Sequence, residues 1–189
     1  MAILLVAAGL IGLIASFILL SEKIHLLKTP DAQLSCNINP IISCGSVIQS
    51  KQAEAFGFAN PIIGLISFAV IITIGMGMLA GAKYKRWFWL GLEAGTIFGI
   101  AFVHWLFYQA VFNIQALCPF CMVVWVVTII LFVYVTFYNL SNKYIGVPAK
   151  LTGLVELGDK YKWAIAVFWV LLIAGVILNQ FWFYWKTLI

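Results

Sequence analysis

The sequence predicts an all-α polytopic membrane protein, built as a four-helix bundle with a fifth transmembrane helix. Hydrophobic residues make up 65% of the chain and charged residues only 9%, whereas a soluble domain carries about 25% charged residues. Five segments are continuously apolar over the roughly 20 residues that a helix needs to cross a bilayer, and none alternates as a barrel strand does. These segments are 3–20, 61–80, 87–112, 118–139 and 163–184. We expect residues 1–189 to form a single integral membrane domain.

The first apolar segment could be taken for a secretory signal. It has no basic start and no small-x-small cleavage site after its apolar stretch, both of which signal peptides carry. We therefore interpret it as a retained first helix. The loop that follows, residues 21–60, is too long for a simple connector, and long loops of this kind are usually functional.

The net charge of +5 predicts topology rather than nucleic-acid binding, because the basic residues do not cluster in any groove-reading motif. Two loops, 81–86 and 140–162, hold most of them. Their basic residues are Lys83, Lys85, Arg86, Lys143, Lys150, Lys160 and Lys162. The positive-inside rule places these loops and the N-terminus in the cytoplasm. The protein is thus expected in the cell inner (plasma) membrane, with loop 21–60 on the periplasmic or extracellular side.

All four cysteines fall on that external side, where disulfides persist. Cys36 and Cys44 lie in loop 21–60, separated by a segment in which Pro40 prevents a continuous helix. Considered alone, this pair fits a structural disulfide as well as a redox pair.

The second pair, in Cys118-Pro-Phe-Cys121, opens the fourth apolar segment. Pro119 suits the first position of a helix, so Cys118 would occupy the cap position and Cys121 the first turn. Free amides and the positive end of the helix dipole favour a thiolate there, and we place it at Cys121. This spacing predicts a reactive dithiol.

Metal binding fits the cysteines less well. Four thiolates could hold zinc, but the seven residues between Cys36 and Cys44 are an unusual zinc spacing. Covalent haem needs histidine directly after the second cysteine, and here Met122 follows Cys121. We predict no metal site.

The fourth helix would carry Cys121, Trp125 and Thr128 on one face, since these residues are spaced at i, i+4 and i+7. Ligand sites in helical bundles form between facing helices. A thiolate beside an aromatic-rich face of this kind favours a quinone as the electron carrier.

In their order along the chain, these motifs resemble the vitamin K epoxide reductase family, in its bacterial form that couples disulfide formation to a quinone. The resemblance covers about residues 11–137. Its motifs are Cys36-x7-Cys44, Gly45-Ser46-Val47 with Ser50, Phe56-Gly57, Asn60-Pro61 and Cys118-Pro-Phe-Cys121.

The resemblance implies a relay. Cys118 and Cys121 would be the active-site pair, with Cys121 facing the quinone, and Cys44 would attack Cys118. Cys36 would exchange with a separate thioredoxin-like (DsbA-like) protein, because no thioredoxin domain follows the fifth helix in this sequence.

The resemblance also implies a site for a quinone of the menaquinone, ubiquinone or vitamin K type, bound by Ser50, Asn60, Cys121 and Trp125. Trp125 stands where animal members have tyrosine, and its indole nitrogen donates a hydrogen bond but accepts none. From the residues alone, Ser50 could equally be an ordinary helix-face residue and Asn60 a helix cap before Pro61.

Two alternatives remain open. One is a vitamin K quinone or epoxide reductase that runs with an external reductant. The other is a non-enzymatic scaffold or transporter with structural disulfides, but transporters show broken helices or several intramembrane charges, and here Glu93 is the one acidic midspan residue. We place neither Glu93 nor His104 in the site.

Overall fold

The computed structural model, which describes residues 1–29, 34 and 36–186, contains five helices long and apolar enough to cross a membrane. They are α1 (Ala2–Lys28), α3 (Pro61–Leu79), α4 (Arg86–Tyr108), α5 (Pro119–Ser141) and α7 (Lys162–Gln180). The predicted all-helical membrane fold is confirmed. The shorter elements are α2 (Cys44–Ile48), η1 (Lys51–Glu54), the π-helical η2 (Gln109–Ile114), η3 (Ala149–Leu151), α6 (Thr152–Lys160) and α8 (Trp182–Trp185).

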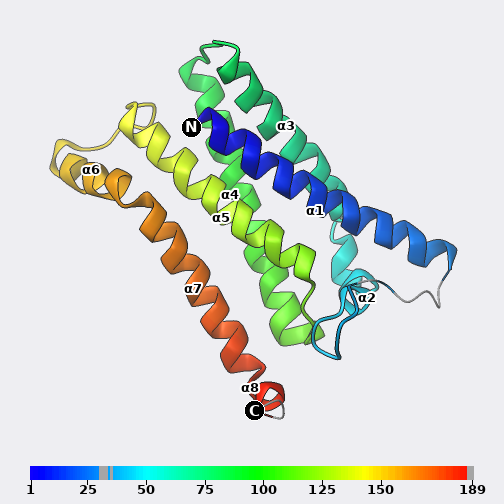
Figure 1. The fold of residues 1–189 in the computed structure, drawn as a ribbon. Helices are drawn as coiled ribbons and strands as arrows, with labels where there is room; N and C mark the ends of the chain where they lie inside the picture. The colour runs from blue at the N-terminus through cyan, green and yellow to red at the C-terminus, as the bar shows by residue number, and fades with distance from the viewer. Residues whose placement is uncertain (30–33, 35, 187–189) are drawn as a thin grey trace.

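Helix α5 lies at the centre of the molecule and contacts α1, α4 and α7, while α1 packs along α3 (Figure 1). The α1 and α3 backbones come close at Gly75, where a Cβ atom would lie 3.0 Å from both Val6 N and Ala2 O. Helices α1, α3, α4 and α5 thus form a bundle, and α7 runs along its outside.

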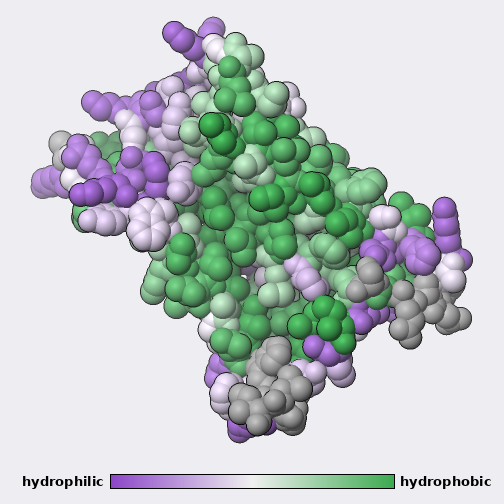
Figure 2. Space-filling model, in the orientation of Figure 1, coloured by the Kyte–Doolittle hydropathy of each residue, from purple (hydrophilic) through white to green (hydrophobic). Residues whose placement is uncertain are grey.

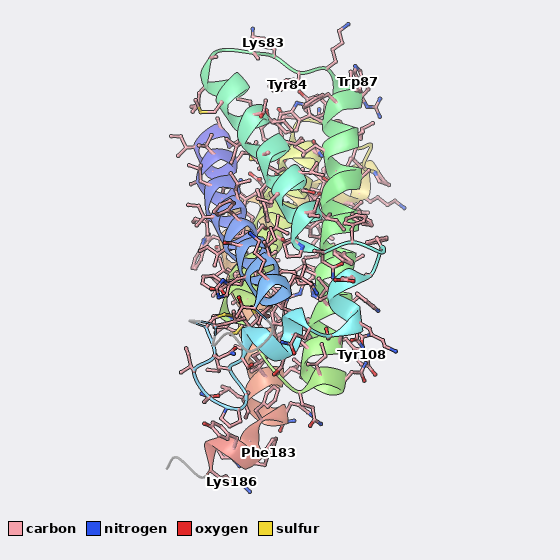
Figure 3. The ribbon with its side chains drawn as sticks, turned by 90° about the vertical axis from the view of Figure 1, so that its right-hand side faces the viewer. Lys83, Tyr84, Trp87, Tyr108, Phe183 and Lys186 are labelled. Atoms are coloured by element: carbon pink, nitrogen blue, oxygen red, sulfur yellow. A yellow bond between two sulfur atoms is a disulfide. The ribbon has the colours of Figure 1, made fainter. Side chains whose placement is uncertain are left out.

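The two ends of the bundle differ in chemistry. The N-terminus, the α3–α4 turn and α6 lie at one end, and α2 and α8 lie at the other (Figure 1). Lys83 and Trp87 mark the first end and Tyr108 and Phe183 the second (Figure 3). The basic loops and the cysteine pairs therefore lie at opposite ends, as predicted.

Between these ends the surface is a broad hydrophobic band, with hydrophilic side chains gathered at the extremities (Figure 2). Phe17, Ile66 and Phe168 are each 63% exposed on this surface. Such apolar exposure suits lipid contact, and the chain is a multi-pass membrane protein.

Helix α1 continues to Lys28, past the predicted end at Leu20. Hydropathy measures how far the apolar stretch extends, whereas polar residues such as Glu22 and Lys23 can continue a helix beyond the hydrocarbon layer. The last predicted span also divides, because α7 ends at Gln180 and α8 follows after Phe181.

Glu93 and His104 join helices to one another. The Glu93 carboxylate accepts hydrogen bonds from Thr136 Oγ1 at 2.7 Å and from Asn139 Nδ2 at 2.8 Å, both on α5. His104 Nε2 accepts a hydrogen bond from Trp169 Nε1 on α7 at 3.0 Å. Neither residue lines the cavity described below.

Candidate active site

The two cysteine pairs meet at the end of the bundle opposite the basic loops. Cys36 and Cys44 form a disulfide, and Cys118 and Cys121 are free thiols. The Cys118 Sγ atom lies 3.2 Å from Cys44 Sγ, and both residues are fully buried. Reacting atoms in a near-attack arrangement are about 3–3.5 Å apart, so a thiol and a disulfide stand at the separation needed for exchange.

Two asparagines between Cys36 and Cys44 give the loop its shape. Asn37 Oδ1 accepts hydrogen bonds from Gly45 N at 3.0 Å and from Ser43 Oγ at 3.1 Å. Asn39 Oδ1 accepts from the backbone amides of Ile41 and Ile42, at 3.0 and 2.7 Å. Asparagine side chains commonly stabilise turns in this way. Neither role was predicted from the sequence, although an Asn-x-Asn-Pro segment is itself a turn signal.

A short backbone pairing joins the two cysteine segments. Leu117 N donates to Ile41 O at 2.7 Å, and Ser43 N donates to Leu117 O at 2.9 Å, around an isolated parallel bridge between Ile42 and Leu117. The chain reaches this bridge through η2 and Gln115, which has a left-handed φ of 55°. The residues immediately before Cys44 and Cys118 are thereby held side by side.

The start of α5 stabilises a thiolate at Cys118. Pro119 occupies the first turn and Cys118 the N-cap position, as predicted. The pKa of Cys118 lies below its ordinary value, chiefly because the Cys121 side chain hydrogen-bonds to its sulfur. The amides of Cys121 and Phe120 also lower this pKa, while burial opposes them. We had placed the stabilised thiolate at Cys121, but the amides of a first turn face the cap residue that precedes it.

The Cys118 thiolate is therefore expected to persist as the pH falls below the ordinary thiol pKa of about 8.5. Its titration can be followed as the ultraviolet thiolate absorbance that the Cys118→Ala protein lacks, with the loop disulfide intact. Cys121→Ala should move the Cys118 midpoint upward, because it removes the main stabilising group and leaves the burial. A midpoint unchanged by Cys121→Ala would show that the Cys121 thiol does not set this pKa.

An apolar cavity of about 530 Å³ lies beneath the cysteines, inside the bundle. Residues from the loop between α1 and α3 and from α1, α3, α4 and α5 line it. It brings together all the residues that were predicted to contact a quinone, with two others from the same site: Ser50, Asn60, Cys121 and Trp125, together with Cys118 and Thr128. Gly91, Gly95 and Gly99 of α4, spaced four residues apart, form a glycine wall of this cavity, which α3 residues also line.

Ser50 and Asn60 are tied to the loop backbone as well as lining the cavity. Ser50 Oγ donates to Val47 O at 2.7 Å. Asn60 Nδ2 donates to Gln52 O at 2.8 Å, and its Oδ1 accepts from Ala55 N at 3.0 Å. Asn60 occupies the position before Pro61 but makes no side-chain cap to α3. Its amide has a second N–H, which is available to a ligand.

Lys23 also lines the cavity, although the sequence did not point to it as a site residue. Its Nζ atom forms an ion pair with Glu54 at 2.8 Å and donates to Ile48 O at 2.9 Å. These contacts fasten α1 to the loop over the cavity. Neither partner could be inferred from the sequence, because both lie far along the chain from Lys23.

A disulfide in contact with a second pair of cysteines, above an apolar cavity in a membrane bundle, is the arrangement of a membrane oxidoreductase. Residues 3–136 match the vitamin K epoxide reductase family, and the chain belongs to it. Members are membrane oxidoreductases that link disulfide chemistry to quinones. No curated protein matches the chain. The family match ends within α5, so that α6, α7 and α8 lie beyond it.

Proposed function

We propose that the protein is a thiol–quinone oxidoreductase that reoxidises a separate thioredoxin-like (DsbA-like) protein and so supports disulfide bond formation. The observation that carries this proposal is the 3.2 Å contact between Cys44 of the loop disulfide and Cys118, whose side chain also lines the apolar cavity. The Cys118 side chain thus contacts the loop disulfide and also lines the cavity that suits a quinone.

The relay balances as a series of thiol–disulfide exchanges. A partner dithiol reduces the Cys36–Cys44 disulfide and becomes oxidised. The Cys44 thiolate then attacks Cys118 of an oxidised Cys118–Cys121 pair, and Cys121 leaves as a thiolate. Cys36 next attacks Cys44, which restores the loop disulfide and releases Cys118. The loop disulfide beside two free thiols corresponds to the state at the end of this series of exchanges.

The cavity fits a quinone. Its wall is mainly apolar, and a volume of about 530 Å³ lies within the 300–1,000 Å³ of ordinary ligand pockets. When bound, a quinone of the menaquinone, ubiquinone or vitamin K type would supply the acceptor for the two electrons and two protons that the reduced Cys118–Cys121 pair gives up. Ser50, Asn60 and Trp125 supply polar groups at the edge of the cavity.

Each of these residues has a defined task in the proposal. Asn60, which its two bonds to the loop hold in place, would donate its second N–H to a quinone carbonyl. Ser50 contributes its hydroxyl on releasing the Val47 carbonyl. Trp125 is buried, stands edge-on to Phe107 with ring centroids 5.3 Å apart, and covers the cavity beside Cys121.

We place the protein in the cell inner (plasma) membrane, with the cysteines on the periplasmic or extracellular side. The positive-inside rule supports this orientation, because the predicted cytoplasmic loops gather at the end of the bundle opposite the cysteines. An oxidising compartment at the cysteine end would also preserve the Cys36–Cys44 disulfide.

The proposed function is tested with the purified protein, a reduced thioredoxin-like protein and a quinone analogue. We expect one quinol to form for each partner disulfide, at a rate that depends on both substrates. Failure to oxidise the partner while a small dithiol still drives quinone reduction would instead favour the vitamin K quinone reductase alternative. Product formation from vitamin K epoxide would extend that alternative to epoxide reduction.

The glycine wall of α4 offers a test of where the quinone tail lies. A Cβ atom at Gly95 would meet no other atom within 4 Å, so Gly95→Leu fills the cavity without disturbing a packed contact. We expect the KM for a long-chain quinone to rise about tenfold, the scale of a misfit in an apolar pocket. The KM for a tailless analogue should change less.

Gly175→Leu is the matched control, because Gly175 also has no neighbour within 4 Å but lies on α7, away from the cavity. Its KM values should equal those of the unmodified protein. Equal effects of Gly95→Leu on long-chain and tailless quinones would place the tail elsewhere.

A further inference from the structure

The last two helices, which lie beyond the family match, contact the redox centre. We propose that Phe181, at the junction of α7 and α8, is a positioning residue for the exchange between Cys44 and Cys118. It acts through Ile41 and Leu117. This inference rests on the proposed function for its purpose, but its test uses neither a quinone nor a partner protein.

Phe181 is unusual among the large side chains of its region. It is 1% exposed, whereas Phe168 and Leu171 on α7 are 63% and 62% exposed and Phe183 on α8 is 64% exposed. Most of α7 is thus available to lipid, and the chain turns inward at the junction with α8 to bury this one ring. The burial of Phe181 therefore indicates that the junction of α7 and α8 packs specifically against the bundle.

The ring of Phe181 lies in one buried cluster with residues from the two segments that carry the reacting sulfurs. Phe181 belongs to one buried cluster with Ile41, Leu117 and Ile177. Ile41 is three residues before Cys44, Leu117 directly precedes Cys118, and both are at most 4% exposed. Phe181 thus belongs to the same buried cluster as two residues whose backbones set the distance between Cys44 and Cys118.

The backbone pairing at this point needs support from outside. It is an isolated bridge with two hydrogen bonds, Leu117 N to Ile41 O and Ser43 N to Leu117 O. Strand pairs gain stability from neighbouring strands and from a packed face, and among the described residues no further strand extends this bridge. The buried cluster that contains Phe181 supplies the packed face.

Helix α7 is itself held against the bundle by side-chain contacts, and these contacts also fix the position of Phe181. Trp169 Nε1 donates to His104 Nε2 at 3.0 Å, which leaves the proton on Nδ1, and that nitrogen donates to Ile100 O at 2.8 Å. The Trp169 ring also meets Phe132 of α5 edge-on, with centroids 6.0 Å apart. These contacts lie about three helical turns before Phe181.

The test measures how favourably Cys44 and Cys118 are placed for bonding. In a Cys36→Ala/Cys121→Ala protein only these two cysteines remain. Oxidised glutathione converts them to a disulfide and is itself reduced to two thiols. The equilibrium in glutathione buffers gives the effective molarity of the pair, read by mass spectrometry after acid quenching and alkylation.

We expect Phe181→Ala to lower this effective molarity about tenfold or more, since the bridge loses its packing. Phe181→Leu should restore most of it. Phe168→Ala, the matched control, removes the same kind of ring from an exposed position on α7 and should leave the value unchanged.

A second pair separates positioning from general loss of structure. In a Cys118→Ala/Cys121→Ala protein, the effective molarity of Cys36 and Cys44 should not respond to Phe181→Ala, because Asn37 and Asn39 shape that loop from within. An equal fall for both pairs, or no fall for Cys44 and Cys118, would overturn the proposal. If Phe181→Ala does not fold, Trp169→Phe applies the same test, because it removes the bond to His104 and loosens α7; an unchanged value for Cys44 and Cys118 would then overturn the proposal.

Discussion

Cys121→Ala is expected to abolish quinone reduction from every electron donor, whether a protein partner or a small dithiol. Cys121 lines the cavity and is the only thiol that can close a disulfide with Cys118 inside it while the loop pair is oxidised. Without that disulfide the pair cannot deliver two electrons together. We expect a loss on the order of 10³-fold or more, as when an enzyme loses its covalent group, measured as quinol formation.

The complementary variant reveals which sulfur faces the quinone. Cys118→Ala leaves Cys121 unpaired in the cavity, so a charge-transfer absorbance band between its thiolate and the quinone should appear. Cys121→Ala should lack this band. Because Cys118 also lines the cavity, a band of equal strength in Cys121→Ala would exchange the two roles. Absence of a band in both proteins, with quinone demonstrably bound, would remove Cys121 from the electron-transfer step.

Cys44→Ala is expected to separate the two electron donors. Turnover with the thioredoxin-like partner should fall on the order of 10³-fold or more, because the sulfur that contacts Cys118 at 3.2 Å is gone. Quinone reduction by a small dithiol should continue, since Cys121 is only partly buried and the cavity remains. The ratio of the two rates in one preparation measures the effect and is independent of the amount of folded protein.

Cys36→Ala provides the comparison for Cys44→Ala. It removes the residue proposed to exchange with the partner but keeps the one that contacts Cys118, so it should also spare the small dithiol more than the protein partner. Partner-driven turnover that survived Cys44→Ala would mean that the partner attacks Cys118 directly, and the loop pair would then be a structural disulfide.

The sequence predicted the features that depend on local physics. Lipid demands about 20 apolar residues in a row, so the five spans could be located from composition alone. Pro119 fixed the start of α5 and the cap position of Cys118 because a first-turn proline is a local signal. The end of α1 was misplaced, since Lys28 lies outside the apolar stretch but still within the helix.

The contacts that assemble the site are non-local and could not be predicted in this way. Ile41 and Leu117 come together across 75 intervening residues, and neither residue type signals a partner. The same holds for Lys23 with Glu54 and for Phe181 with the bridge. The pairing of Cys44 with Cys118 was expected only through the family resemblance, because four cysteines alone permit several connectivities.

The burial of the loop disulfide has a kinetic consequence for the proposed relay. Cys36 is 5% exposed and Cys44 not at all, so a partner thiolate reaches Cys36 only when the loop opens. The observed rate then equals the intrinsic exchange rate multiplied by the fraction of open molecules, and an open fraction of about 1% would slow it about a hundredfold. Free thiols in the surroundings meet the same barrier without the binding energy of a docked protein to open the loop. The closed loop thus protects the disulfide from reduction by free thiols. Docking of the correct partner opens the loop and allows the exchange.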